Sequence, residues 1–430
     1  MTPHPSSFDN RDHQQFEKTV LNNGITVYIY TDHFPINCVE IILPVGSAHA
    51  IVENNFLPGA PHLLEHTQLI RSQTYPDAYQ LDRLLGLQAG HSNAATHAKS
   101  TNHWIDTPVA KQEFAISSLV DRVFYPTFNN EDLAIERGVI INERNQKKFY
   151  PGKSKASHYY YTQFLNDTFF PLEQIFGSDA DLNQATIGFL ETMHHQVSRS
   201  NEVIALAVGN SSFESLKEKL AALETASCSF QTQITPTTWA NKDYHLSYFD
   251  TVAQPLLEIA WIHPSLEYKE FRSLCFIIGL LINTTQGPLY KEFREEKGWT
   301  YGIDGTCVRR ECNTVCGLSF PLNSLDQVEY VRDGLSERIF KALQNQGLIE
   351  DEIERQLGNQ VYAYQTAGSI ISGASTDLIN GGSIHSEAEL EETMQAMKDP
   401  FWRDYLRQHY FKPEEMGAVC FMPERRKTNY

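Results

Sequence analysis

The stretch GAPHLLEHTQLI, residues 59–70, contains three side chains whose types and spacing suit metal-dependent hydrolysis. Glu65 and His66 follow His62 by three and four positions, so all three would share one face of a helix. Two histidines one turn apart can direct imidazole nitrogens at one zinc ion, which typically takes three protein ligands at a catalytic site and leaves a position for water. Glu65 could then take a proton from that water.

A third ligand has to come from elsewhere in the chain. Glu143 lies in IERGVIINERN, whose amphipathic pattern predicts a helix, and Glu136 lies two turns earlier on the same face. We therefore predict one Zn²⁺ per chain, held by His62, His66 and Glu143. Glu136 is expected to orient a histidine or the water without binding the ion itself. The alternative is a helix whose histidines are only hydrogen-bonded.

Composition restricts the classes of function. The chain has 430 residues, a hydrophobic content of 41% and a formal net charge of −18. Its length favours two or three domains, and its acidity argues against nucleic-acid binding. No apolar run is long enough to cross a membrane, and the first 20 residues do not resemble a secretory signal or a transit peptide. The seven scattered cysteines are interpreted as reduced thiols in a cytoplasmic compartment. The cluster Cys307, Cys312 and Cys316 is interpreted as small apolar residues of paired strands, with a second metal site as the alternative.

The order of predicted elements indicates an α+β fold with an internal repeat. Each half begins with strands, ITVYIYTD and YHLSYFD, and later contains a predicted helix with Ile-Glu-Arg, at residues 135–137 and 353–355. The Thr-, Gln- and Pro-rich segment between the halves reads as a linker. We predict a zinc-binding peptidase domain at residues 1–228, a linker at 229–243, and a homologous second domain without metal at 244–430. Each domain is expected to be a mainly antiparallel sheet covered by helices.

The two halves differ where chemistry is expected. The segment matching PHLLEH is SLCFIIG, which has no histidine or glutamate, and Val361 takes the position that corresponds to Glu143. A polar trio required for folding of this domain should occur in both copies. Its presence in one copy favours a functional role there.

Several segments together resemble one peptidase family. HLLEH resembles the inverted zinc motif of the pitrilysin and insulin-degrading enzyme family, the inverzincins, which includes the mitochondrial processing peptidase. GHSNAAT is similar to the family's Gly-x-x-Asn-Ala-x-Thr stretch, IERGVIINE to the segment that ends in the third zinc ligand, and FREEKGWTY to its Arg/Tyr segment. The segments HSNAATHAK and TNHWIDTPV alternate in polarity and predict a β-hairpin. The sequence departs from the family pattern at Pro61, in TQLIRSQTYPD, which lacks the usual Gly-Thr turn, and at His97, Lys99 and Trp104 of this hairpin. These departures bear on substrate preference more than on metal binding.

The resemblance implies roles for further residues. Asn93, Ala94 and Thr96 match a strand that holds the substrate backbone, and an exposed strand edge can bind peptides through main-chain hydrogen bonds. Arg294 and Tyr301 match groups that reach the scissile carbonyl from the other domain, where such donors can stabilise an oxyanion. The alternatives are a surface arginine, an ordinary strand tyrosine and a turn asparagine.

The resemblance also implies an assembly. Family members of about twice this length enclose a chamber with four such domains, so two of these chains would form clamshell halves, as a homodimer or as a heterodimer with a zinc-free relative. The expected activity is zinc-dependent endopeptidase cleavage of unstructured peptides inside the chamber. The alternative is a non-catalytic or partner-dependent subunit of a heterodimeric peptide-processing peptidase. We expect a peptide substrate and no nucleic-acid or membrane partner.

Overall fold

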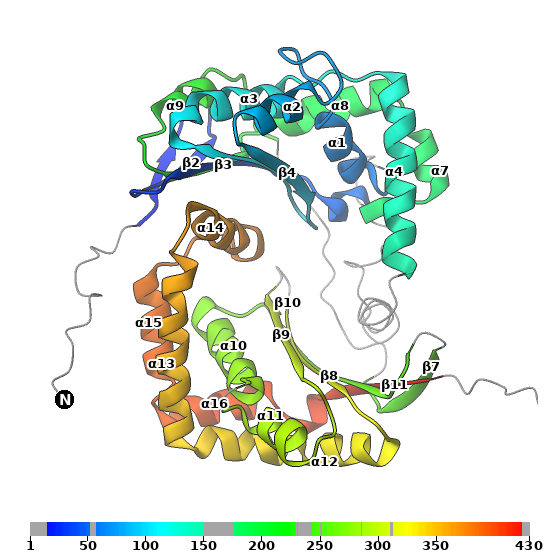
Figure 1. Cartoon of the computed structure of the whole chain (residues 1–430), viewed down its shortest axis with the longest axis vertical. Coiled ribbons are helices and arrows are strands. Elements are labelled where there is room, and N and C mark those ends of the chain that lie inside the picture. The colour runs from blue at the N-terminus through cyan, green and yellow to red at the C-terminus, as the bar shows by residue number, and fades with distance from the viewer. Residues whose placement is uncertain are drawn as a thin grey trace, which may run out of the picture. The chain divides into compact units, whose positions relative to one another are not determined.

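The computed structural model describes residues 15–51, 57–149, 175–228, 230, 242–249, 252–284, 286–309 and 313–423. The chain forms two compact units that interleave along the sequence (Figure 1). The described residues of the first unit fall within Met1–Ile141, Leu172–Thr232 and Tyr362–Ala388; those of the second fall within Asn142–Pro171, Gln233–Val361 and Glu389–Tyr430. The predicted linker, residues 229–243, lies mostly outside the described residues, and the division of the chain at that linker stays a prediction.

The first unit is built on a six-stranded mixed sheet. Its strands are β1 (Glu17–Val20), β2 (Thr26–Thr31), β3 (Ile36–Leu43), β4 (His91–Thr96), β5 (Thr101–Pro108) and β6 (Ile204–Gly209). Their order is β1-β2-β6-β3-β5-β4, and every neighbouring pair is antiparallel except β2 and β6. The predicted hairpin of HSNAATHAK and TNHWIDTPV is confirmed as β4 and β5.

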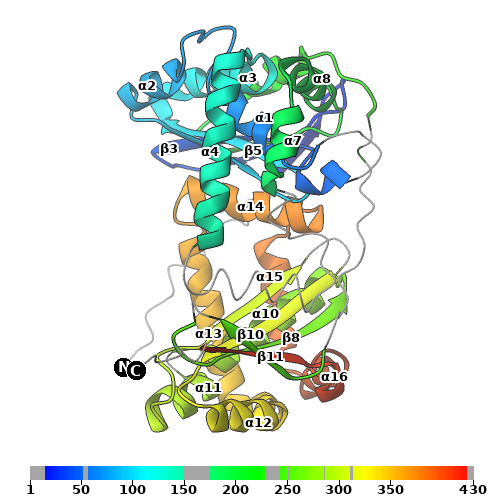
Figure 2. The same cartoon turned by 90° about the vertical axis from the view of Figure 1, so that its right-hand side faces the viewer.

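Helices cover both faces of this sheet (Figure 1). Those of the first unit are α1 (Ala60–Gln68), α2 (Gln80–Leu87), α3 (Gln112–Phe124), α4 (Asn130–Phe149), α7 (Asp179–Gln184), α8 (Ile187–Ser198), α9 (Glu214–Ala221) and α14 (Ala367–Gly381). α1, α3, α8 and α9 bury their leucines, isoleucines and valines against one face. α14 packs its Ile370, Ile371 and Ala374 against the other. α4 runs without a break past Ile141, where the division between the units falls (Figure 2).

The alternation of side chains along β3 explains why this strand needs helices on both of its faces. Ile41 and Leu43 belong to the core under α1 and α3, whereas Cys38 and Ile42 belong to the core under α14. Successive strand residues point to opposite faces of the sheet. A strand with apolar side chains on both faces therefore has to be covered on both. The structure covers it with elements from both ends of the chain.

A carboxyl group is buried beneath α14. Glu40 of β3 is 5% exposed, and its Oε1 accepts hydrogen bonds from Asn102 Nδ2 at 2.5 Å and Ser375 Oγ at 2.6 Å. Burial raises the pKa of Glu40 to about 7, against the lowering effect of the Ser375 and Asn102 hydrogen bonds, and the charge of Asp106 raises it further. The contact between β3 and α14 therefore depends on a carboxyl group that titrates near neutrality.

The second unit is built on a five-stranded mixed sheet. Its strands are β7 (His245–Phe249), β8 (Leu256–Pro264), β9 (Asp304–Arg309), β10 (Asn313–Pro321) and β11 (Gly417–Pro423), in the order β7-β11-β8-β10-β9. Its helices are α10 (Tyr268–Ile282), α11 (Pro288–Tyr290), a π-helical turn (Lys291–Glu296), α12 (Leu325–Gln344), α13 (Gln346–Ala363), α15 (Glu387–Ala396) and α16 (Pro400–Tyr410). α10 contains the apolar run LCFIIGLLI, and none of the described helices is both long and apolar enough to span a bilayer.

The two sheets confirm the predicted α+β fold with two mixed domains of one design. In each, the first and last strands of the repeat are parallel neighbours, β2 with β6 and β7 with β11. The remaining strands follow in the same antiparallel order, β3-β5-β4 and β8-β10-β9. α10 therefore occupies the place of α1, between the second and third strands of the repeat.

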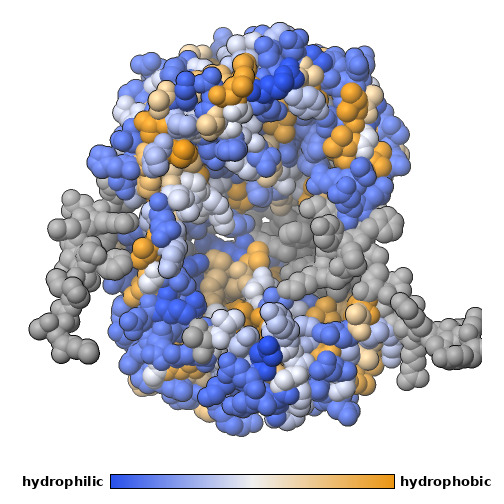
Figure 3. All heavy atoms as spheres, viewed as in Figure 1, coloured by the Kyte–Doolittle hydropathy of each residue, from blue (hydrophilic) through white to orange (hydrophobic). Residues whose placement is uncertain are grey.

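In the view of Figure 3, hydrophilic residues dominate the surface of both units.

We expect Glu40→Gln to stabilise the metal-free protein at alkaline pH. The folded-state pKa of Glu40, about 7, exceeds the ordinary value of 4.5. Its favourable contribution is therefore complete below pH 4.5 and is lost as pH rises through 7. Glutamine keeps an acceptor for Asn102 and Ser375 and carries no charge, so the gain should grow from pH 5 to pH 8.5 and reach on the order of 3 kcal/mol. Denaturant unfolding across this range, with chelator present, measures it.

Glu218→Gln is the matched control, because Glu218 is an exposed carboxylate of the same unit. It should change the unfolding free energy little at any pH. A gain from Glu40→Gln that is equal at pH 5 and pH 8.5 would contradict the assignment of the titrating group.

Candidate metal centre

α1 begins where the backbone makes a tight approach to another segment. Gly59 precedes the helix with φ of 79°, and a Cβ at this position would lie 2.6 Å from the backbone of Phe176 and Gly177. Only glycine accepts this combination without strain. Pro61 lies in the first turn, where its missing N–H removes no helical hydrogen bond. The departure at Pro61 is thus compatible with a regular helix start.

The start of α1 places His62 against the aromatic ring of Phe176. The His62 side chain is buried, and the ring of Phe176 meets its imidazole edge-on with centroids 5.1 Å apart. Leu63 and Leu64 of the same helix are buried in the core of the unit. The apolar residues between the polar ones therefore fix the rotation of α1 and, with it, the direction of both histidines.

The structure brings the three predicted ligands together. One ligating atom from each of His62, His66 and Glu143 lies within 4.8 Å of the other two, and the two Nε2 atoms are 3.2 Å apart. Two nitrogens bound tetrahedrally to zinc at 2.0–2.1 Å would be about 3.3 Å apart. His62 is buried, and His66 and Glu143 are half-buried. The donor set and its spacing fit a catalytic zinc ion, and within the described residues it is the one such group of three.

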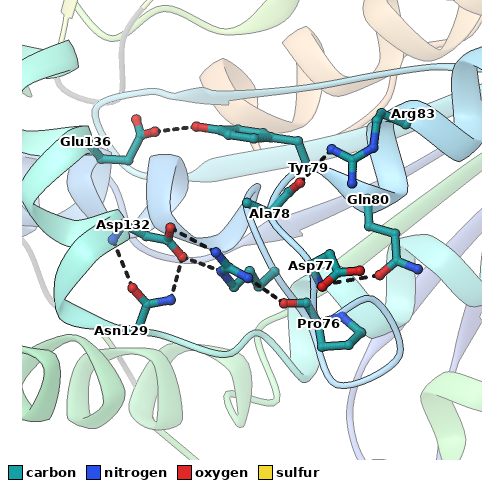
Figure 4. Close-up of polar contacts among 10 residues, drawn as sticks. Pro76, Asp77, Ala78, Tyr79, Gln80, Arg83, Asn129, Asp132 and Glu136 are labelled. Carbon is teal, nitrogen blue, oxygen red and sulfur yellow. Dashed lines mark hydrogen bonds and ion pairs between the residues drawn. The ribbon is translucent and has the colours of Figure 1, made fainter.

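Glu136 contacts His66 on the side of its ring away from His62. Its Oε2 is 2.8 Å from His66 Nδ1, and its Oε1 accepts a hydrogen bond from Tyr79 Oη at 2.8 Å (Figure 4). An imidazole that donates Nδ1–H to a carboxylate keeps the lone pair of Nε2 for a metal. The carboxylate of Glu136 is 6% exposed, so these two partners offset the cost of burying its charge.

Glu65 has a partner that the sequence did not reveal. Its carboxylate is buried on α1, and Oε2 accepts a hydrogen bond from Thr96 Oγ1 at 2.5 Å. Thr96 was expected to contact substrate; in the structure its hydroxyl contacts the candidate base. Strand β4 and helix α1 are thereby joined at the residue on which proton transfer would depend.

β4 is the edge strand of its sheet among the described residues. It pairs with β5 on one side only, with Asn93 opposite Trp104 and Ala94 opposite His103. Asn93 is exposed and accepts a hydrogen bond from Ala94 N through its own side chain, whereas Ala94 is buried. An edge strand presents free main-chain groups to which an extended peptide can add.

Arg294 and Tyr301 lie in the second unit and contact each other. Arg294 belongs to the π-helical turn, and its guanidinium lies 5.2 Å from the centroid of the Tyr301 ring. Tyr301 is 88% exposed, so its hydroxyl is available to a ligand. π-Helical turns are uncommon and often occur at functional sites.

The second unit has apolar residues where the first has the trio. Leu274, Ile277 and Ile278 of α10, in the segment SLCFIIG that matches PHLLEH in the sequence, are all buried in the core of that unit. The described residues of the second unit contain no comparable ligand group. These three side chains offer no metal ligand, and they pack in the core of the second unit.

Comparison with known proteins gives two family matches. Residues 10–169 match the family model described as insulinase (peptidase family M16), and residues 186–360 match the model described as peptidase M16 inactive domain. Protease 3 of Escherichia coli K12 is 25% identical over 148 residues, which cover 34% of this chain and 15% of that protein. The matched stretch is thus a small part of this curated relative.

Solved structures show the same fold over nearly the whole chain. A protease from Helicobacter pylori superposes with a TM-score of 0.78 at 17% identity, covering 95% of this chain and 100% of that one. The periplasmic protease PqqL from E. coli gives a TM-score of 0.75 at 15% identity, covering 95% of this chain and 48% of that one. The present chain therefore corresponds in length to about half of PqqL.

Proposed function

This chain belongs to the insulinase family of peptidases, peptidase family M16, and from this premise we propose that it is a zinc-dependent endopeptidase that cleaves unstructured peptides within an enclosed chamber. The observation that carries the proposal is the convergence of His62, His66 and Glu143, with Glu136 against the far nitrogen of His66. Two histidines on one helix could be hydrogen-bonded in many ways. Two Nε2 atoms facing each other at 3.2 Å are better explained by a shared ion.

The zinc ion, when bound, would supply Lewis-acid activation and a coordination position for the attacking water. Glu65 lies on the same face of α1 as both histidines. It would therefore accept the proton of that water and transfer it to the leaving amine. Thr96 Oγ1 donates a hydrogen bond to Oε2 of Glu65 and would fix the orientation of this carboxylate for the proton transfer. Burial of Glu65 away from bulk water favours transfer to substrate over exchange with solvent.

Substrate binding is proposed to use β4 and the Arg/Tyr pair. The edge of β4 at Asn93 and Ala94 would add the peptide as a further strand, which gives affinity with little demand on sequence. Arg294 and Tyr301 would donate hydrogen bonds to the carbonyl oxygen as negative charge develops on it. The exposure of Tyr301 and its contact with Arg294 support this role.

Hydrolysis and zinc binding can be separated by two substitutions. Wild-type protein should bind about one zinc per chain and cleave a quenched peptide in a chelator-sensitive manner. Glu65→Gln should keep the zinc and lose about 10²–10⁴-fold in turnover, since only the proton acceptor is removed. Glu143→Gln should lose zinc affinity and, with it, activity. Metal analysis and the peptide assay on the same samples give both quantities.

The control for Glu143→Gln is Glu131→Gln, on an exposed residue of the same helix, which should keep both properties. Normal cleavage by Glu65→Gln would refute the base assignment. Zinc binding without cleavage by the wild-type chain, with cleavage appearing only after a family partner is added, would favour the partner-dependent subunit.

The chamber is proposed to form from two chains of this protein in the cytoplasm. The chain has about half the length of PqqL and contains both the metal trio and the Arg/Tyr pair, so two copies would provide a full set of domains with two sites. We expect sedimentation of the active protein to give a dimer. Full activity of a monomer at concentrations where no dimer forms would contradict this assembly.

A further inference from the structure

The segment that follows the zinc-motif helix is tied to α4 by two separate contacts (Figure 4). Arg71 donates to both carboxylate oxygens of Asp132, at 2.6 and 3.4 Å, and to the carbonyl of Pro76 at 2.6 Å. Asn129 binds the same carboxylate at 2.7 Å. This segment, TQLIRSQTYPD and the residues after it, is where the sequence departs from the family's Gly-Thr turn. Arg71, which lies in this segment, holds the segment against the first turn of α4.

Tyr79 makes the second contact. Its backbone has φ of 55°, a left-handed conformation that a bulky residue adopts only at a cost, and its N–H donates to the carbonyl of Ile70 at 2.9 Å. The residue is 43% exposed, so burial of the ring does not account for its position. Its hydroxyl instead donates to Glu136, one turn of α4 beyond Asp132.

Both oxygens of Glu136 are thereby assigned. Oε1 receives the Tyr79 hydroxyl and Oε2 faces His66 Nδ1, each at 2.8 Å. Burial, together with Glu136, raises the pKa of Tyr79 to about 12, so the hydroxyl keeps its proton at neutral pH. With one oxygen held by Tyr79, the carboxylate cannot rotate freely about its terminal bond. The other oxygen then stays in the direction of the histidine.

We propose that Tyr79 is a positioning residue of the metal centre, which acts through Glu136 to hold the His66 ring with Nε2 toward His62 and Glu143. The inference rests on the proposed function in one respect, since it takes His66 as a zinc ligand. It concerns a residue that touches neither the ion nor the peptide. Substitution of Tyr79 should therefore change zinc affinity more than it changes substrate binding.

Tyr79→Phe tests the proposal, with Tyr75→Phe as its matched control. Tyr75 lies in the same segment, and its hydroxyl is also hydrogen-bonded, to Ser118 Oγ at 3.0 Å, on a path that does not lead to His66. Competition with a chromophoric chelator should show a roughly tenfold weaker zinc affinity for Tyr79→Phe, the low end of the effect of outer partners. Tyr75→Phe should stay within about twofold of wild type. Metal-free unfolding midpoints should show that both variants fold.

A double-mutant cycle with Glu136→Gln tests whether Tyr79 acts through Glu136. If it does, Tyr79→Phe should weaken zinc binding little further in the Glu136→Gln background. Fully additive effects, or equal zinc affinities of Tyr79→Phe and Tyr75→Phe, would overturn the inference and leave the zinc proposal intact. Failure of the wild-type chain to bind zinc would overturn both.

A pair of thiols in the second unit carries an independent inference. Cys307 of β9 and Cys316 of β10 are directly opposite each other in antiparallel register, and their sulfurs are 2.8 Å apart. Directly opposed strand residues have Cα separations within the range that a disulfide spans. Cys307 is half-buried on the edge strand, and Cys316 is buried. Cys275 of α10 contacts Cys307 from the helix layer.

We infer that Cys307 and Cys316 form a reversible cross-strand disulfide when the protein meets a peroxide. The more exposed Cys307, as thiolate, would attack hydrogen peroxide to give a sulfenic acid and hydroxide. The thiol of Cys316 would then attack the sulfenic sulfur, so that the S–S bond forms and water leaves. The bond would join β9 to β10, and β9 begins at Asp304, three residues after Tyr301.

The reaction should be slow at neutral pH. The hydrogen bond with Cys275 lowers the pKa of Cys307, but the hydrogen bond with Cys316 and burial outweigh it and hold that pKa well above its usual range. The thiolate is the reactive form, so the rate should rise with pH. The pair is thus suited to sustained exposure to oxidant rather than to a brief pulse.

Thiol counting and peptide mapping of the full chain after hydrogen peroxide treatment test this site. Wild type should lose two free thiols and yield the 307–316 cross-linked peptide, and a reductant should restore both. Cys316→Ser should leave Cys307 as a sulfenic acid that dimedone traps. Cys420→Ser, which removes a buried thiol from the same sheet, should still form the bond. A full thiol count after treatment, or a link from Cys307 to Cys275, would overturn the assignment.

Discussion

The hydrogen bond between His66 and Glu136 is the interaction on which the candidate centre depends, because it joins the two helices that have to converge. α1 supplies two imidazoles and α4 supplies the distant carboxylate, and a ligand set from two helices exists only at one relative depth and rotation. Glu136 and Glu143 are seven residues apart, two helical turns, so a contact that fixes the first also directs the second. The buried leucines of α1 and Leu133 and Ile140 of α4 hold the two helices from the apolar side.

The two sheets show what this polar arrangement costs. One strand order is used twice, and in the second copy the segment that matches PHLLEH has no histidine or glutamate and buries Leu274, Ile277 and Ile278. Burying such a side chain contributes about 1.5–3 kcal/mol, whereas a buried carboxylate has to be compensated by hydrogen bonds or an ion. In the first copy the compensation comes from Thr96 for Glu65 and from Tyr79 and His66 for Glu136. The first copy therefore gives up apolar packing for a preorganised polar site.

Local spacing explains which parts of this centre could be predicted from sequence. The pattern His-x-x-Glu-His specifies its own geometry once a helix forms, and the seven-residue interval between Glu136 and Glu143 does the same on α4. The alternation of HSNAATHAK and TNHWIDTPV likewise predicts the hairpin of β4 and β5. The contacts of Thr96 with Glu65 and of Tyr79 with Glu136 join residues 31 and 57 positions apart, and no local pattern encodes them. Asp132 and Arg71 are likewise ordinary surface-type residues until the segment after α1 folds back onto α4.

The position of α14 shows a second limit of prediction from sequence, which concerns the bounds of a domain and not the contacts of single side chains. Its sequence, AGSIISGASTDLING, reads as a small-residue helix of the second half, and the predicted domain 244–430 includes it. In the structure its apolar face covers Cys38, Ile42 and Leu206 of the first sheet, and Ser375 binds Glu40. A chain that ended after β6 and α9 would leave this apolar face of the first sheet, and the carboxyl group of Glu40, exposed to water. The first compact unit therefore includes a helix from the second half of the chain, so the repeat seen in the sequence and the compact unit are not the same segment.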